Sequence, residues 1–127
     1  MEGKEDLDVT TSDPQISVYN FSDTILGNNL YFHVIKLCDS FHICVGTAPV
    51  MKNMAVAMQT EFDRGAASGS ILMGDLSDPV SLNMAQRLAK RTGKQVFVSC
   101  SVAYNQTLMP LLEKRIGEEI KDHPDKF

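Results

Sequence analysis

The sequence lacks the features that mark membrane and secreted proteins. No apolar run approaches the roughly 18 residues that a membrane-spanning helix needs. The first residues are acidic and polar, so they resemble neither a secretory signal nor a transit peptide. The three cysteines, Cys38, Cys44 and Cys100, cannot all pair, and none lies in a Cys-x-x-Cys motif. We therefore expect reduced thiols in a cytosolic or nuclear protein.

Motifs for enzymatic chemistry are also missing. Residues 65–69, Gly-Ala-Ala-Ser-Gly, lack the Gly-x-Ser-x-Gly spacing of a nucleophile elbow and the Gly-Lys-Ser/Thr ending of a phosphate-binding loop. Glycine and small polar residues of this kind are typical of a flexible surface loop. Asp75 and Asp78 are explained as turn and cap residues rather than as an acid/base pair. We expect no catalytic residue and no cofactor.

The excess of negative charge is confined to one end of the chain. Residues 1–14 hold five acidic residues and one lysine, so they carry the whole net charge of −4, and the rest sums to zero. A neutral body offers no long-range attraction to the phosphates of nucleic acid. The acidic segment has no aromatic residue and few apolar ones, which is typical of disorder. We predict a disordered acidic tail over residues 1–14.

The remaining residues, 15–127, are expected to form one domain. A chain of 127 residues is long enough to bury roughly two-thirds of its unfolded surface. Its apolar content of 43% and charged content of 22% are ordinary for a globular protein.

The most informative stretch runs from Ile71 to Val102 and predicts a strand, a helix and a strand. Asp78 is expected to cap the helix, with Pro79 at the first helical position and Gly93 just past its end. Apolar residues at helical spacing form one face of this helix: Met84, Ala85, Leu88 and Ala89. Alternate residues of the second strand share one side: Val96, Val98, Cys100 and Val102.

Further elements lie on both sides of this unit. Strands are predicted at Ile16–Phe21, Leu30–Cys38, Phe41–Val45 and Met54–Met58, followed by a polar loop over residues 61–69. A second helix is predicted over residues 105–122 with Thr107 as its N-cap, and with the pairs Lys114–Glu118 and Arg115–Glu119 on its solvent side. Its buried ridge is Leu108, Leu112, Ile116 and Ile120. The order β-β-β-β-β-α-β-α predicts an α+β domain with a single, mostly antiparallel six-stranded sheet and two helices.

Strands 30–38 and 41–45 are predicted to form a hairpin with Asp39 and Ser40 at its tip. We expect one face of this hairpin to be core beneath the helices, namely Phe32, Val34, Phe41, Ile43 and Val45. The opposite face is apolar as well, although an antiparallel sheet in a monomer usually exposes one polar face to solvent. Two short helices can cover only one face, so we predict that a partner subunit covers the other. The proposed contact residues on this face are Tyr31, Ile35, Leu37 and His42.

His33, His42 and Cys44 share that second face, and imidazole and thiolate are zinc ligands. A structural zinc site needs four ligands, and the sequence offers no fourth residue nearby. We therefore interpret the histidines as amphipathic residues at a subunit contact and expect no metal.

The one concentrated basic patch is Arg87, Lys90, Arg91 and Lys94. It has no aromatic residues among the cations, which argues against nucleic-acid binding. Two interpretations remain open. The charges complement the carbonyl end of the helix, or Arg87, Lys90 and Arg91 contact an acidic protein partner.

The run from Ala85 to Ser99, AQRLAKRTGKQVFVS, closely resembles the proteasome assembly chaperone 4 family. Shorter matches lie before and after it in the same order: Gly74-Asp75, Ser77-Asp78, Asn20-Phe21-Ser22, Phe32-His33-Val34, Ala55 to Met58, and Pro124-Asp125-Lys126-Phe127. The likeness covers roughly residues 18–127 and leaves out the acidic tail.

This resemblance implies a non-enzymatic chaperone that forms a heterodimer with proteasome assembly chaperone 3. The pair is expected to act on the α subunits of the proteasome core particle, promoting assembly of the α ring, with no role for nucleic acid or membrane. One alternative is a homodimeric structural module of the same fold with a different protein partner. A small hydrolase or transferase is disfavoured, because it would need a convergent pocket with perturbed titratable groups.

Overall fold

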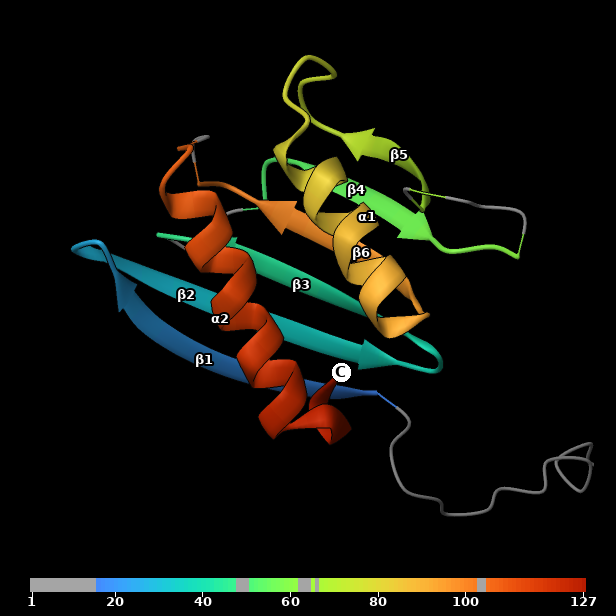
Figure 1. Ribbon diagram of the computed structural model, residues 1–127, viewed down its shortest axis with the longest axis horizontal. Helices are drawn as coiled ribbons and strands as arrows, with labels where there is room; N and C mark the ends of the chain where they lie inside the picture. The colour runs from blue at the N-terminus through green and yellow to red at the C-terminus, as the bar shows by residue number, and fades with distance from the viewer. Residues whose placement is uncertain (1–15, 48–50, 62–64, 66, 103–104) are drawn as a thin grey trace, which may run out of the picture.

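The computed structural model describes residues 16–47, 51–61, 65, 67–102 and 105–127, so the predicted tail over residues 1–14 lies outside it. The order of elements is the predicted one, five strands, a helix, a strand and a helix (Figure 1). The elements are β1 (Ser17–Ile25), β2 (Asn28–Leu37), β3 (Ser40–Gly46), β4 (Met54–Met58), β5 (Ser68–Met73), α1 (Val80–Thr92), β6 (Gln95–Cys100), α2 (Leu108–Asp122) and the short helical turn η2 (Pro124–Lys126). None of these helices has the length and apolar character to cross a membrane, within the described part of the chain.

The strands form one sheet in the order β1-β2-β3-β6-β4-β5. All neighbouring pairs are antiparallel except β3 and β6, which run parallel. The predicted α+β class with one mostly antiparallel six-stranded sheet and two helices is confirmed. The parallel pair arises because β6 returns to the middle of the sheet through α1, which crosses over one face.

The tip of the β2–β3 hairpin is one residue earlier than predicted. Leu37 pairs with Ser40, so the turn consists of Cys38 and Asp39, and Asp39 adopts a left-handed φ of 56°. Asp is among the few residues that tolerate this conformation, and Ser is not, which explains the position of the turn. The shift changes every cross-strand partner by two residues. Because side chains alternate with a period of two, the predicted faces survive.

The ends of the helices also differ slightly from prediction. Gly93 ends α1 in the left-handed region with φ 70°, as expected. Pro79, however, occupies the N-cap position, and Asp78 reaches across it to accept the N–H of Val80 at 3.2 Å. In α2 the N-cap is Thr107, but its side chain makes no capping bond. Asn105 caps instead, because its Oδ1 accepts the N–H groups of Thr107 (2.9 Å) and Leu108 (3.1 Å).

Several strands have different limits from those predicted. β1 extends to Ile25 and β6 stops at Cys100. β5 begins at Ser68, inside the predicted loop over residues 61–69, and Ala67 before it is buried. Residues 62–64 and 66 of that loop lie outside the described residues.

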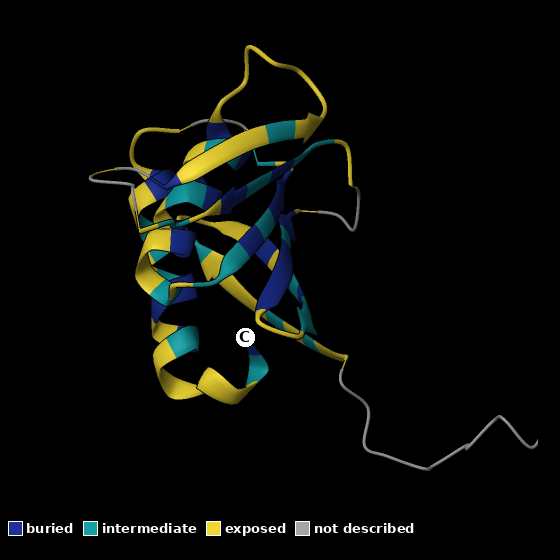
Figure 2. Cartoon of the chain, turned by 90° about the vertical axis from the view of Figure 1, so that its right-hand side faces the viewer, coloured by how far each residue is buried: buried dark blue, intermediate teal, exposed yellow. Residues whose placement is uncertain are grey.

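Both helices lie on the same side of the sheet, and the core fills the space between them and the strands (Figure 2). The predicted core residues of the hairpin are at most 1% exposed: Phe32, Val34, Phe41, Ile43 and Val45. The predicted faces of α1 and β6 are buried with them, including Met84, Leu88, Val96 and Val98. The prediction of the core is confirmed.

The chain ends on this same layer. Phe127 is 2% exposed and packs edge-on against Phe41, with ring centroids 5.4 Å apart. Lys94 donates to the main-chain oxygen of Phe127 at 2.7 Å, and Lys36 donates to that of Asp125 at 2.8 Å. These two lysines therefore secure the last residues against the sheet.

A buried carboxylate attaches α2 to β1. Glu119 is 6% exposed, which contradicts its predicted place on the solvent side. It accepts hydrogen bonds from Tyr19 of β1 and from Arg115 at 2.6 Å, and Arg115 also bonds Asp23 of β1 at 2.9 Å. Burial acts to raise the pKa of Glu119, but the bonds from Tyr19 and Arg115 lower it overall. The other predicted pair, Lys114–Glu118, does not form an ion pair in the described structure.

We expect Glu119→Gln to lower the free energy of unfolding at pH 7 by about 1.5–3 kcal/mol, because a buried charged acceptor is lost. Folding lowers the pKa of Glu119, so its carboxylate stabilises the protein above the unfolded pKa of about 4.3. This stabilisation is lost as pH falls through the lower folded value, and the variant should then match the natural chain. Urea unfolding at several pH values measures both effects. The control is Glu118→Gln, at an exposed neighbouring position, and an equal loss there would contradict the assignment.

Candidate protein-interaction face

The side of the sheet opposite the helices is the candidate site, and we call it the open face. Figure 2 shows no described helix on this side. The strands contribute to it through every second residue, because their other residues point into the core. Its members include Val18, Tyr31, His33, Ile35, Leu37, His42, Cys44, Val56, Phe97 and Ser99.

Cross-strand pairing arranges these residues in rows. The central row runs across five strands in the order Val18, Ile35, His42, Phe97, Val56. Four of its five members are apolar. In the neighbouring row, which faces the helices, Val34, Ile43, Val98 and Ala55 are fully buried. The sheet thus carries an apolar row on each face, and the described helices cover only one.

The exposure of the predicted contact residues is uneven. Tyr31 is 53% exposed, and Ile35 and Leu37 are half-buried by their neighbours on the sheet. His42 is only 7% exposed, and its Nε2 lies 3.0 Å from the hydroxyl of Ser99. Burial lowers the pKa of His42, and the nearby His33 lowers it further. The structure therefore brings all four predicted residues to one face. The side chain of His42 is buried within this face, and those of Tyr31, Ile35 and Leu37 are more exposed to solvent.

A shallow hollow of about 630 Å³ lies at one end of the open face. Tyr31, His33, Cys44 and Met51 form part of its lining, and no Asp, Glu, Lys or Arg among the described residues contributes to it. Two of its polar side chains are bonded to each other, since Nδ1 of His33 and Oδ1 of Asn20 form a hydrogen bond across β1 and β2. An uncharged hollow of this kind accepts an apolar side chain more readily than an ion.

The possible metal ligands on this face do not converge into a site. His33 pairs directly across the strands with Cys44, while His42 is directed to Ser99. Among the described residues, no three His, Cys, Asp or Glu side chains are grouped so as to hold a metal ion. Burial raises the pKa of the Cys44 thiol, which disfavours the thiolate that zinc binds.

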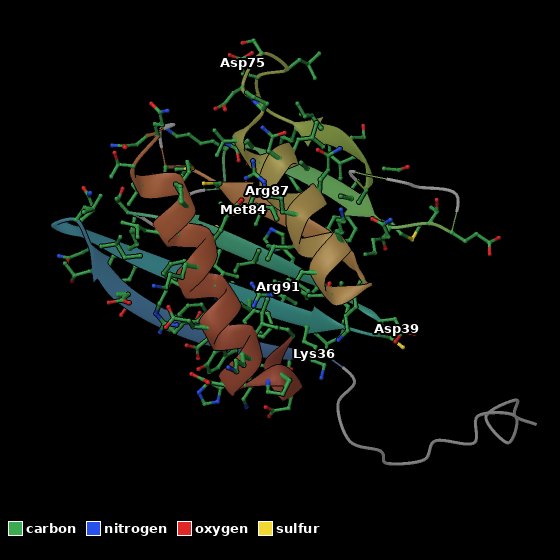
Figure 3. The ribbon with its side chains drawn as sticks, viewed as in Figure 1. Lys36, Asp39, Asp75, Met84, Arg87 and Arg91 are labelled. Carbon is green, nitrogen blue, oxygen red and sulfur yellow. The ribbon has the colours of Figure 1, made fainter. Side chains whose placement is uncertain are left out.

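The predicted basic contact residues lie on the helical side of the molecule, away from the open face. Arg87 of α1 forms an ion pair with Glu113 of α2. Arg91 occupies the space that a side chain at Gly117 of α2 would need, and Figure 3 shows both arginines between the helices. Lys90 is exposed and has no ion-pair partner in the described structure. Two of the three cations thus connect the helices, and only Lys90 is unengaged.

Three apolar residues of the open face were not predicted from the sequence, namely Val18, Val56 and Phe97. The alternation of side chains along each strand shows which residues share a face with Val18, Val56 or Phe97. Whether that face is the core or the open face depends on the order of the strands in the sheet. The parallel pairing of β3 with β6 has no local signal in the sequence.

Comparison with known proteins agrees with this architecture. Residues 29–102, more than half of the chain, match the family model described as "Proteasome assembly chaperone 4". The human protein of that name is 42% identical over 120 residues, which cover 94% of this chain and 97% of the human one. The mouse protein is also 42% identical, over 117 residues covering 91% and 94%.

A solved structure shares the fold at low sequence identity. It is described as "Crystal Structure of a Novel Chaperone Complex for Yeast 20S Proteasome Assembly", and its matching chain is 17% identical with a TM-score of 0.59. The match covers 83% of this chain and 96% of the yeast one. The family model and the two mammalian relatives, supported by this common fold, establish that the chain belongs to the proteasome assembly chaperone 4 family.

Proposed function

We propose that the chain is a non-enzymatic chaperone whose open face binds proteasome assembly chaperone 3, and that this pair promotes assembly of the proteasome α ring. Family membership supports a role in proteasome assembly. The yeast neighbour comes from a chaperone complex, which supports a second chaperone as partner. We place this activity in the cytosol or the nucleus, where the three free cysteines would stay reduced.

The observation that carries this proposal is the uncovered apolar row from Val18 to Val56. Burying apolar surface contributes roughly 25 cal/mol per Å², so leaving such a row in water forgoes stabilisation that a partner can supply. Stable subunit interfaces have an apolar centre of this kind with few charges. The open face meets that description across five strands.

The polar groups of the open face suit binding rather than catalysis. A catalytic nucleophile or base needs a free reactive atom facing substrate. Here one ring nitrogen of each histidine already has a partner, since Nδ1 of His33 bonds Asn20 and Nε2 of His42 bonds Ser99. Such bonds fix the histidines as parts of a preformed surface.

A homodimer would bury the same face, because an apolar surface can pair with a second copy across a two-fold axis. The two assemblies are distinguished by mass. Light scattering of the chain alone and after mixing with proteasome assembly chaperone 3 tests which forms. A 1:1 complex on mixing supports the proposal. A stable homodimer whose mass does not change when the second chaperone is added contradicts it.

Substitutions on the two faces should separate folding from pairing. We expect Val34→Asp to unfold the chain, since an unpaired carboxylate in the core costs several kcal/mol against a small total stability. Ile35→Asp should leave the chain folded and prevent pairing, because the carboxylate becomes buried and unpaired only when the partner covers the open face. Leu26→Asp introduces the same charge at a position that is 57% exposed on the β1–β2 turn, and it should pair normally.

Circular dichroism measures folding in these variants, and co-purification with proteasome assembly chaperone 3 measures pairing. Normal pairing of Ile35→Asp would show that the open face is not the interface. If the chain is stable only in the complex, Ile35→Asp will look unfolded alone. A compensating basic substitution on the partner should then rescue Ile35→Asp but not Val34→Asp.

The unengaged lysine on α1 tests whether the basic patch attracts a proteasome subunit. We expect Lys90→Glu to slow association of the pair with recombinant proteasome α subunits at low salt and to leave melting temperature unchanged, because exposed charges contribute little to stability. Arg87→Glu should in addition destabilise the chain, since it opposes Glu113. Lys114→Glu, an exposed lysine on α2, is the control. Association rates equal to the control would assign the patch to helix-end electrostatics and helix packing.

A further inference from the structure

The end of β5 and the loop that joins it to α1 hold a concentration of exposed apolar side chains. Leu76 is 78% exposed, and Leu72 and Met73 before it are 54% and 42% exposed. Single exposed leucines are common on protein surfaces, but three large apolar residues within a short segment are not. Figure 1 shows this loop projecting beyond the end of the sheet and of α1.

Hydrogen bonds hold the loop in one conformation. The Asp75 carboxylate accepts the N–H of Ser77 at 2.8 Å and its hydroxyl at 2.7 Å, and the N–H of Asp78 donates to the Asp75 carbonyl at 3.1 Å. Figure 3 labels Asp75 at the outer part of the loop. Leu76 lies within this turn in sequence, takes part in none of these bonds, and has its side chain in solvent.

The base of the loop is attached to the centre of the fold. Gly74 has φ 104°, and a side chain there would lie 2.6 Å from Cβ of Asn53. Asn53 is itself fixed, because its Oδ1 accepts the Ser81 hydroxyl at 2.8 Å and the N–H of Cys100 at 3.0 Å. A loop that is already ordered loses little conformational entropy when it binds.

Two carboxylates lie on either side of the exposed leucine. Asp75 and Asp78 each bond only main-chain or hydroxyl groups, and neither has an ion-pair partner among the described residues. An apolar side chain between two unneutralised acids is complementary to an apolar pocket with a basic rim.

We propose that Leu76, with Leu72 and Met73, inserts into an apolar pocket rimmed by Lys or Arg on a proteasome subunit. This inference rests on the proposed function, because it assigns the surface to the subunit on which the chaperone pair acts. β5 is the edge strand beside β4, so the loop is adjacent to the Val56 end of the open face. It lies four strands from β2, which carries Tyr31, Ile35 and Leu37, a distance of roughly 19 Å at ordinary strand spacing. Because the loop also projects beyond the sheet (Figure 1), it can bind one chain while the β2 part of the open face binds another.

The test compares variants of the chain in complex with proteasome assembly chaperone 3. Each pair is titrated with individual recombinant proteasome α subunits by biolayer interferometry. We expect Leu76→Asp to weaken binding to one of them by about tenfold or more, since a central apolar anchor is replaced by a charge. Leu26→Asp, an exposed leucine on another turn, should bind as the natural chain does. Asp78→Asn keeps the acceptor oxygen for Val80 and should reduce the dependence of affinity on salt.

The outcomes distinguish this inference from the proposed function. If the natural pair binds an α subunit and Leu76→Asp binds it equally well, the inference is wrong and the proposed function stands. If the natural pair does not form or binds no α subunit, both fail. If Leu76→Asp disrupts the chaperone pair itself, or if the loop instead mediates self-association seen by light scattering, the assignment to a proteasome subunit is wrong.

Discussion

The structure depends on the fact that the sheet has two apolar faces and the described helices cover only one of them. Six strands present two apolar faces, and the two helices are enough to cover one. The covered face is the core that holds the monomer together, and the open face is built from the alternate residues of the same strands. Since each strand contributes to both faces, the residues that stabilise the fold and those that offer an interface are adjacent in sequence, as Val34 and Ile35 are.

The helical layer is secured by polar contacts as much as by apolar packing. Glu119 and Arg115 attach α2 to β1, Arg87 and Glu113 connect α1 to α2, and Lys94 holds the last residues against the sheet. Among the described residues near α1, Lys90, Arg91, Asp75 and Asp78 have no ion-pair partner. The molecule thus offers an apolar surface on one side and charged, more exposed features elsewhere.

The sequence predicted the elements, their order and the two faces of the hairpin. The faces were correct although the turn was misplaced, because a shift of one residue at the tip changes cross-strand partners by two and preserves the alternation. Long-range contacts could not be predicted. Nothing in the sequence around Glu119 indicates that Tyr19 of β1 contacts it. The periodicity of α2 instead predicts that Glu119 lies on the solvent side of the helix. Likewise, Arg87 and Arg91 have the spacing of helix-end charges, but their contacts with α2 depend on how the two helices pack.

The reactivity of the cysteines tests most directly whether a partner covers the open face. Cys44 lies on that face, Cys38 is exposed on the β2–β3 turn, and Cys100 is buried with its pKa raised to about 11, chiefly by burial. Alkylation with iodoacetamide, followed by mass spectrometry, gives the rate at each site in the isolated chain and in the complex with proteasome assembly chaperone 3. Protection of Cys100 in both samples shows that the chain is folded. We predict that the rate at Cys44 relative to Cys38 falls by about tenfold or more in the complex, since alkylation requires solvent access to the thiolate. An unchanged ratio in a complex that has formed would show that the partner binds elsewhere.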